Sequence, residues 1–314
     1  MSEMDNATVR DPAAGSKASC EPLNEFLARL VKTIDVALNE WVPGESAGPS
    51  SIHQAMRYSL FAGGKRIRPV LAIAAGGAIA DSPRGVEHAA ATLELVHTYS
   101  LIHDDLPALD NDDLRRGRPT CHRVFGEAMA ILAGDALLTL AFEVLSRLPD
   151  IAAERKIRLV EELSRAAGTV GGMIGGQVND LAGERQQPTA ALLDSIHRAK
   201  TGALLRASVR MGGIYAGATA RELAALSSYG EHIGLAFQII DDVLDIEESS
   251  EVLGKTAGKD EAQQKITFPA VYGLERSRQM AEQERVAAHS SLSIFGVRAE
   301  RLRQIADFIV QRKA

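Results

Sequence analysis

Apolar residues recur along most of the chain at the three- and four-residue spacing of an amphipathic α-helix. Phe26, Leu30, Ile34 and Leu38 follow this spacing near the start, and residues 93–102 follow it again later. Residues at this spacing line one face of a helix, and that face packs on a core. The pattern therefore predicts helices over nearly the whole chain.

Breaks rich in glycine, proline, serine or charge interrupt this pattern and separate roughly ten or more helices. They fall at residues 42–50, 62–69, 79–85, 115–122, 148–151, 182–188 and 246–260. None is long or polar enough for a domain linker, and no segment repeats at a period of about 20 to 50 residues. The sequence therefore predicts a single all-α domain over residues 21–314, preceded by a flexible tail at residues 1–20.

The composition supports this fold class and excludes several functions. Only 4% of the 314 residues are aromatic, whereas alanine, leucine and glycine are abundant, so residues that favour strands are scarce. The formal net charge of -6 argues against a general nucleic-acid binder, which needs positive charge. Cys20 and Cys121 lie far apart without a CxxC pair, which argues against a disulfide framework and a thiolate zinc site.

Targeting signals are also missing from the sequence. Residues 1–20 carry scattered charges and lack the apolar centre of a secretory signal. The longest apolar stretch, residues 69–80, is about 12 residues long, against about 20 for a helix that crosses a membrane. We therefore expect a cytoplasmic protein without a membrane span.

The first candidate site is an acidic segment that directly follows an apolar helical run. It contains Asp104, Asp105, Asp110, Asp112 and Asp113. Carboxylates this close repel one another unless a cation neutralises them. Pro107 fits poorly inside a helix, so the helix should end or kink there and bring Asp110 back towards Asp104. The alternative interpretation is a solvated helix end.

The second acidic cluster interrupts another apolar segment. Asp241 and Asp245 are four residues apart, so both carboxylates project from one face of a helix, with Gln238 one turn earlier. Ligands that offer only oxygen atoms suit Mg²⁺, which typically joins one or two carboxylates to substrate phosphates. Because two such clusters end apolar helices, a metal site in a helical bundle is favoured over two solvated surfaces.

Basic residues near these clusters are candidates for phosphate binding. They are Lys65, Arg66, Arg68, Arg115, Arg116, Lys200 next to Thr201, Lys255, Lys259 and Lys265. Adjacent Arg115 and Arg116 should point in opposite directions and serve two different phosphates. Each residue alone is equally consistent with a charge exposed on a turn. Their joint arrangement in an acidic protein favours a polyanionic ligand.

These segments occur in one order: GGKRIRP, HTYSLIHDDLPALDNDDLRRGRPTCH, GGQVNDL, KTGALL, FQIIDDVLD and GKTAGKD. In this order they resemble the trans-prenyltransferases, the isoprenyl diphosphate synthases that join isopentenyl diphosphate to an allylic diphosphate. The resemblance covers nearly the whole chain after the tail. It implies an antiparallel helical bundle around a deep central cavity. The first acidic motif has the form DDxxxxD, which resembles bacterial farnesyl and plant geranylgeranyl diphosphate synthases.

The resemblance also implies roles for individual residues. A cluster of three Mg²⁺ ions would be bound by Asp104, Asp105, Asp110, Asp241 and Asp245. Mn²⁺ accepts similar oxygen ligands. The allylic diphosphate would be bound by Arg115, Lys200, Lys255 and Lys265. Isopentenyl diphosphate would be bound by Gly64, Lys65, Arg68, His97 and Arg116. Thr201 and Gln238 would lie along the carbon where positive charge develops, supported by Gln177 and Asp180.

Chemically, the implied reaction explains these residue types. Loss of pyrophosphate from an allylic diphosphate leaves a carbocation, and groups that bind the departing anion lower that barrier. The double bond of isopentenyl diphosphate then attacks, and a proton leaves. The sequence offers no obvious nucleophilic triad, which agrees with released pyrophosphate acting as the base.

Product length in the resembled family depends on bulk below the first acidic motif. Tyr99 and Ser100 stand five and four residues before Asp104, and Tyr99 lies about 7.5 Å down the helix. We therefore expect farnesyl diphosphate, made from dimethylallyl or geranyl diphosphate. Tyr99 could instead be ordinary core packing. Open alternatives are a geranylgeranyl diphosphate synthase, a class I terpene cyclase and a non-catalytic helical subunit; a homodimer is the expected assembly.

Overall fold

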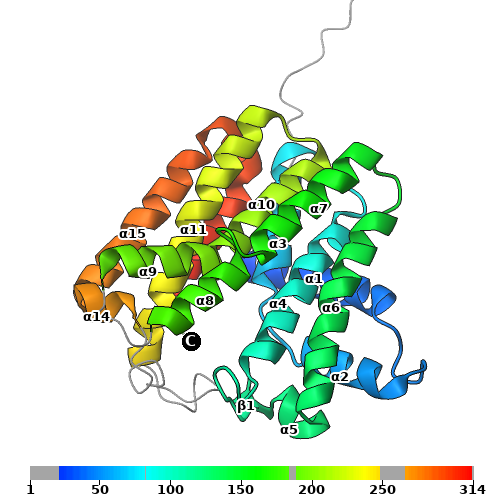
Figure 1. Cartoon of the computed structure of the whole chain (residues 1–314). Coiled ribbons are helices and arrows are strands. Elements are labelled where there is room, and N and C mark those ends of the chain that lie inside the picture. The colour runs from blue at the N-terminus through cyan, green and yellow to red at the C-terminus, as the bar shows by residue number, and fades with distance from the viewer. Residues whose placement is uncertain (1–20, 82, 184–188, 248–265, 313–314) are drawn as a thin grey trace, which may run out of the picture.

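The computed structural model describes residues 21–81, 83–183, 189–247 and 266–312 as a bundle of helices (Figure 1). The all-α fold predicted from the sequence is confirmed. The only strands in these ranges are β1 (Leu114–Arg115) and β2 (Arg118–Pro119), which form a small antiparallel hairpin.

The helices keep the order that the breaks in the sequence predict. The first half contains α1 (Leu23–Trp41), α2 (Ser50–Leu60), α3 (Ile67–Ile79), α4 (Val86–Asp104), α5 (Cys121–Phe125), α6 (Glu127–Arg147) and α7 (Ala153–Ala167). The second half contains α8 (Met173–Gly183), α9 (Ala190–His197), a π-helical turn η1 (Arg198–Gly202), α10 (Ala203–Ala216) and α11 (Ala220–Glu247). The described chain ends with α14 (Phe268–Tyr272), α15 (Leu274–Ser291), the 3₁₀ segment η2 (Ser293–Ala299) and α16 (Glu300–Gln311).

Helix α4 lies in the middle of the bundle. It packs against α1, α3, α6 and α10, and it is buried on most sides from Val86 to Ile102. A helix that is apolar all round belongs in a core rather than at a surface. The neighbouring helices therefore fix the position of its carboxyl end, which carries the first acidic cluster.

Both acidic clusters lie at one end of the bundle. The carboxyl ends of α4 and α11 are both at the lower end of the molecule in Figure 1, and the β1–β2 hairpin follows α4 there. The two clusters are far apart in the sequence, so the packing of the long helices is what brings them to the same side.

One helix in the described ranges is long and apolar enough to cross a membrane. It is α6, with 21 residues and a mean hydropathy of 1.8 over its most apolar window. The sequence analysis singled out residues 69–80 instead, because Asp135 and Glu143 interrupt the apolar run of α6. One such helix is weak evidence for a span, since core helices share this composition, and α6 packs against α2, α4 and α7.

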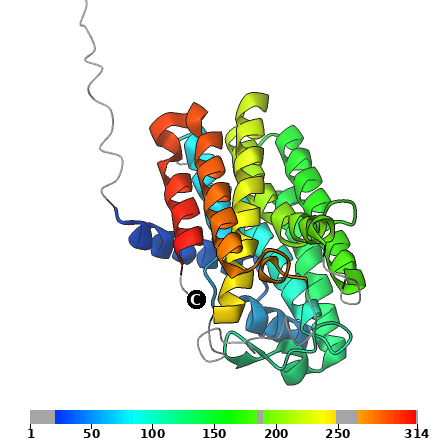
Figure 2. The same ribbon diagram turned by 90° about the vertical axis from the view of Figure 1, so that its left-hand side faces the viewer.

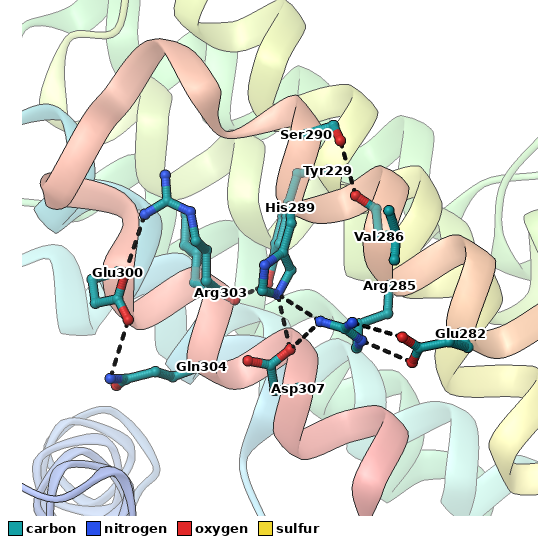
Figure 3. A network of polar contacts seen from close by, with 11 residues as sticks. Tyr229, Glu282, Arg285, Val286, His289, Ser290, Glu300, Arg303, Gln304 and Asp307 are labelled. Atoms are coloured by element: carbon teal, nitrogen blue, oxygen red, sulfur yellow. Dashed lines mark hydrogen bonds and ion pairs between the residues drawn. The ribbon is translucent and has the colours of Figure 1, made fainter.

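The last helix is held against the bundle by polar contacts. The guanidinium of Arg285 on α15 binds Glu282 on its own helix and Asp307 on α16, 2.7 Å away, while His289 lies 2.9 Å from the same Asp307 (Figure 3). The hydroxyl of Tyr229 on α11 donates to the carbonyl of Leu302 at 2.7 Å. In Figure 2, α11, α15 and α16 lie side by side in yellow, orange and red. These contacts fix where α16 ends.

A smaller core joins α9, α11 and α14, and a buried histidine lies beside it. The ring of His197 stacks on Phe268 with centroids 5.2 Å apart, and its Nε2 is 3.6 Å from Asp242 Oδ2. Burial lowers the pKa of His197 to about 4, and the carboxylate of Asp180 only partly opposes this. The native protein therefore keeps His197 neutral at pH values where the unfolded chain protonates it.

We expect His197 to make the protein less stable as the pH falls from about 6.5 towards 4. In that window the unfolded state binds the extra proton, so the free energy of unfolding decreases with decreasing pH. Between pH 7 and pH 5, wild type should lose about 2 kcal/mol more than His197→Gln. Urea unfolding at both pH values and equal protein concentration measures this, and equal losses in both proteins would contradict it.

Candidate active site

The first acidic cluster forms a tight turn at the end of α4. The helix ends at Asp104, and the backbone N–H of Asp110 donates to the carbonyl of Asp104 at 2.8 Å. The N–H of Asp112 reaches the carbonyl of Asp105 at 3.1 Å. The predicted return of Asp110 towards Asp104 after Pro107 is thus confirmed.

The carboxyl group of Asp104 is electrostatically linked to a lysine on another element. Burial raises the pKa of Asp104 to about 6; the charge of Lys200 opposes this rise, and the carboxylate of Asp110 adds to it. The charges of Lys200 and Asp110 therefore both act on the carboxyl group of Asp104. A divalent cation there would relieve the repulsion between the carboxylates.

Asp105 has a different environment from Asp104. It is buried, and Arg115 binds it through Nε at 2.8 Å and Nη2 at 2.6 Å. A paired carboxylate–guanidinium contact of this kind is strong and geometrically specific. Arg115 also lies 3.7 Å from Asp112. In this structure Arg115 therefore holds the acidic turn together, while its expected contact with phosphate stays a prediction.

The second acidic cluster lies on the last turns of α11, as predicted. Asp241 binds Nη2 of Arg312, 2.5 Å away, and Asp245 is buried. Between them, Asp242 accepts hydrogen bonds from Gln238 Nε2 at 2.7 Å and from the backbone N–H of Phe268 at 2.9 Å. Asp242 thus fixes Gln238 and the start of α14.

A π-helical turn carries Lys200 and Thr201. It spans Arg198–Gly202 between α9 and α10, and such turns widen a helix by one residue, often at functional sites. Lys200 Nζ binds Asp180 Oδ2 at 2.5 Å, and the hydroxyl of Thr201 donates to Gln238 Oε1 at 2.8 Å. The predicted supporting role of Asp180 has a geometric basis in this contact, whereas no contact of Gln177 bears on its role.

A cavity of about 500 Å³ collects the basic residues that the sequence analysis assigned to isopentenyl diphosphate. It is lined by Gly64, Lys65, Arg68, His97 and Arg116, together with Ala62, Arg66, Ile67, Glu94, Phe237 and Arg312. These residues come from the loop between α2 and α3, from α3, α4, α11 and the β1–β2 hairpin, and from the residue that follows α16. The structure therefore unites the whole predicted group in one pocket.

The charge state of this pocket favours an anion. Burial lowers the pKa of His97 well below its usual value, and the neighbouring charges of Arg68 and Arg116 lower it further. His97 is therefore neutral at physiological pH and can donate one hydrogen bond. The Nε atoms of Arg68 and Arg312 are buried without a hydrogen-bond partner. Buried donors of this kind are costly unless a ligand accepts from them.

The loop that precedes α3 is shaped to approach this pocket closely. Gly64 has a φ of +136°, and an added Cβ would lie 2.7 Å from the guanidinium of Arg116, which donates to the carbonyl of Gly63. Arg66 adopts a left-handed conformation with a φ of 47°, stabilised by a buried ion pair with Glu94 at 2.8 Å. Arg115 binds Asp105 whereas Arg116 binds the carbonyl of Gly63, and their expected contacts with two phosphates stay a prediction.

Sequence reasoning missed two residues of the site. Arg312 follows α16 and reaches both the basic pocket and Asp241, with its guanidinium 4.0 Å over the ring of Phe237. Asp242 accepts hydrogen bonds from the side chain of Gln238 and from the backbone of Phe268, so it fixes these two residues instead of projecting beside Asp241. The amphipathic pattern of α16 predicts a helix, but it does not show which part of the molecule the end of that helix reaches. The doubled Asp241–Asp242 pair gave the only signal for Asp242.

The remaining predicted residues are two side chains on α4 and three lysines. Tyr99 is buried on α4 with an unpartnered hydroxyl, and burial raises its pKa to about 12; Ser100 Oγ donates to the carbonyl of His97 at 2.9 Å. Lys255 and Lys265 lie outside the described residues, as does Lys259.

The donor atoms fit Mg²⁺, but the described carboxylates are not arranged around a common point as metal ligands. All candidate ligands offer oxygen atoms, the type that Mg²⁺ prefers. Within the ranges that the structure describes, no three acidic, histidine or cysteine side chains surround one point at metal-binding distance. Arginines bind Asp105 and Asp241 instead. An ion here would complete its coordination with water and phosphate oxygens.

An all-helical bundle with two acidic helix ends and a basic pocket agrees with the class of enzyme that elongates prenyl diphosphates. The chain belongs to the polyprenyl synthetase family, whose model matches residues 49–293.

Named relatives agree with this family. Farnesyl diphosphate synthase of Geobacillus stearothermophilus is 43% identical over 292 residues, which are 92% of this chain and 98% of that protein. Geranylgeranyl pyrophosphate synthase 12 of Arabidopsis thaliana is 46% identical over 293 residues, 91% of this chain and 81% of that protein. The solved geranyltransferase of Helicobacter pylori, complexed with magnesium and isoprenyl diphosphate, has a TM-score of 0.82 and 30% identity; the match covers 94% of this chain and 100% of that one. Prenyl chain elongation is therefore the activity of this chain.

Replacing Asp104 or Asp241 by alanine should lower turnover about a hundredfold to a thousandfold, the usual cost of one electrostatic group at a reaction centre. The fold should persist, because neither change removes core volume. Pyrophosphate release and far-ultraviolet circular dichroism measure the two effects. Asp113→Ala is the matched control, since Asp113 pairs with Arg123 at the exposed edge of the same cluster. Near-normal turnover of a folded Asp104→Ala variant would reject the assignment.

Arg312→Ala should raise the KM for isopentenyl diphosphate about tenfold to a hundredfold and change kcat less, because it removes a charged donor from the basic pocket. Steady-state kinetics with each substrate varied separately measure this. Arg303→Ala on the preceding helix α16 is the control, since Arg303 binds the carbonyls of Leu292 and Gly296 and does not line the pocket. An unchanged KM would remove Arg312 from the site.

Proposed function

We propose that the chain condenses isopentenyl diphosphate with dimethylallyl or geranyl diphosphate and stops at farnesyl diphosphate. The observation that carries this proposal is Tyr99, a buried aromatic side chain on α4 five residues before Asp104. Five residues advance about 7.5 Å along a helix, so Tyr99 starts about 7.5 Å below Asp104. We assign its ring to the floor of the substrate pocket, where it would end the apolar tail of a growing product.

The first step is loss of pyrophosphate from the allylic substrate. When bound, Mg²⁺ neutralises the diphosphate and stabilises the leaving anion. We assign its binding to Asp104, Asp110 and Asp241, with Asp105 and Asp245 in support, and expect three ions, with Mn²⁺ as an alternative metal. Lys200 is oriented by Asp180 and adds a positive charge near Asp104. A neighbour solved with magnesium and isoprenyl diphosphate supports this choice of metal.

Aligned dipoles stabilise the positive charge that then develops on the allylic carbon. Thr201 donates its proton to Gln238, and Gln238 donates to Asp242. The hydroxyl oxygen of Thr201 therefore keeps its lone pairs free to face a cation. Stabilisation of this kind acts most strongly where water is excluded.

Isopentenyl diphosphate is assigned to the basic pocket. Lys65, Arg68 and Arg116 supply charge, and neutral His97 supplies a hydrogen bond. The double bond then attacks the allylic carbon, a carbon–carbon bond forms, and a proton leaves to released pyrophosphate. We assign Lys255 and Lys265 to the allylic diphosphate on the sequence motif alone, because both lie outside the described residues.

We also propose a cytoplasmic homodimer. Large apolar side chains on α6 and α8 are exposed in the single chain, among them Ile131, Leu132 and Val178. Exposed apolar surfaces of this kind favour a protein partner, and a second copy would bury them.

Incubation with geranyl and isopentenyl diphosphates, with Mg²⁺ or with EDTA, tests the proposed product. We expect pyrophosphate release only with Mg²⁺ and a fifteen-carbon alcohol as the main product after dephosphorylation and chromatography. A twenty-carbon main product would support the alternative geranylgeranyl diphosphate synthase, which the Arabidopsis relative favours. Absence of pyrophosphate release would favour the non-catalytic subunit.

The same assay with Tyr99→Ala tests the floor of the pocket. Removing the ring should lengthen the main product to twenty carbons or more, because the chain can then extend past α4. Tyr99→Phe is the matched control and should keep the wild-type length, since the Tyr99 hydroxyl has no hydrogen-bond partner. An unchanged product from Tyr99→Ala would mean that Tyr99 is ordinary core packing.

A further inference from the structure

His103 fills the space between α4 and α6 one residue before the acidic turn. Its Nε2 lies 3.0 Å from the carbonyl of Ile131 and 4.0 Å from a carboxylate oxygen of Asp135, both on α6. The Nε2 end of the ring therefore points at the backbone of α6. None of the roles assigned above uses this residue.

The contact depends on a glycine in the middle of α6. A Cβ built on Gly134 would lie 2.1 Å from His103 Nε2, 2.6 Å from Cδ2 and 2.9 Å from Cε1. Real Cβ atoms do not come this close to other atoms, so the imidazole occupies the place of a side chain at position 134. Glycine inside a helix costs about 1 kcal/mol relative to alanine. The packing of His103 explains why α6 accepts that cost.

His103 in turn packs on Tyr99, one turn earlier on the same face of α4. The two ring centroids are 5.7 Å apart and the rings meet edge to face at 80°. Tyr99 is only 6% exposed, and its hydroxyl has no hydrogen-bond partner. No directional bond orients the tyrosine, so the packing of its neighbours decides where the ring lies.

We infer that Gly134 and His103 are positioning residues for chain-length specificity, which hold the Tyr99 ring at the depth that ends the product. This inference rests on the proposed role of Tyr99 as the floor. Gly134 lets the imidazole reach the backbone of α6, and the imidazole blocks the space into which Tyr99 would otherwise turn. The floor is thus built from two helices, and its depth depends on a residue of α6 that never touches substrate.

A cycle of variants tests this arrangement through product length. His103→Ala leaves a void beside Tyr99, so the ring can turn aside, and the ratio of twenty-carbon to fifteen-carbon product should rise about fivefold or more. In a Tyr99→Ala background the same His103→Ala change should alter the ratio less than twofold. Gly134→Ala displaces the imidazole and should alter the ratio in wild type, but not in the His103→Ala protein, where the methyl group enters empty space.

Controls separate packing from damage to the reaction. The rate of the first condensation, geranyl with isopentenyl diphosphate, should stay within about threefold in every variant except those at Tyr99, because no group assigned to substrate or metal is changed. Asp135→Ala removes an exposed carboxylate that approaches the same imidazole and should leave the product ratio unchanged. Circular dichroism confirms folding, and the double variant covers the case in which Gly134→Ala alone fails to fold.

Two results would overturn the inference without touching the farnesyl assignment. One is a wild-type product ratio in folded His103→Ala while Tyr99→Ala lengthens the product. The other is an equal effect of His103→Ala with and without Tyr99. A wild-type enzyme that releases no fifteen-carbon product would instead reject the proposed function itself.

Discussion

Charge compensation between buried or half-buried carboxylates and cations is the constraint on which this structure depends. Leaving a buried charge without its partner costs about 3 to 5 kcal/mol, as much as a large cavity in the core. Asp105 is paired with Arg115, Asp180 with Lys200, and Asp241 with Arg312. Each pair joins elements that are distant in the sequence. The side chains in these pairs are also ones assigned to the diphosphate substrates and their ions, so under that assignment ligand binding would exchange one set of partners for another.

The scaffold places these charges on the ends of well-packed helices. α4 is buried on most sides, and α16 is held through Arg285, Asp307 and the Tyr229 hydroxyl. Arg66, before α3, and Arg116, after α4, both have a positive φ. Such conformations cost free energy and persist where surrounding contacts over-determine them. The ion pair of Arg66 with Glu94 supplies one of those contacts beside the basic pocket.

Much of the fold and part of the site could be predicted from the sequence, because the signals are local. Apolar spacing predicted the helices, and Pro107 predicted the return of Asp110. The features that could not be predicted are contacts between residues that lie far apart in the sequence. Nothing local shows that Arg312 reaches Asp241, that an arginine binds Asp105, or that Gly134 faces His103. The apolar character of α6 was missed because two acidic residues divide its run.

The π-helical turn at Arg198–Gly202 interrupts regular α-helical hydrogen bonding and at the same time sets the position of two candidate site residues. Deleting one residue there would let α9 and α10 join as one regular α-helix with better hydrogen-bond geometry. It would also rotate everything on one side of the cut by about 100° relative to the other, and the Lys200–Asp180 and Thr201–Gln238 contacts could not both survive. The irregular turn therefore keeps both contacts, and the packed faces of α9 and α10, in register.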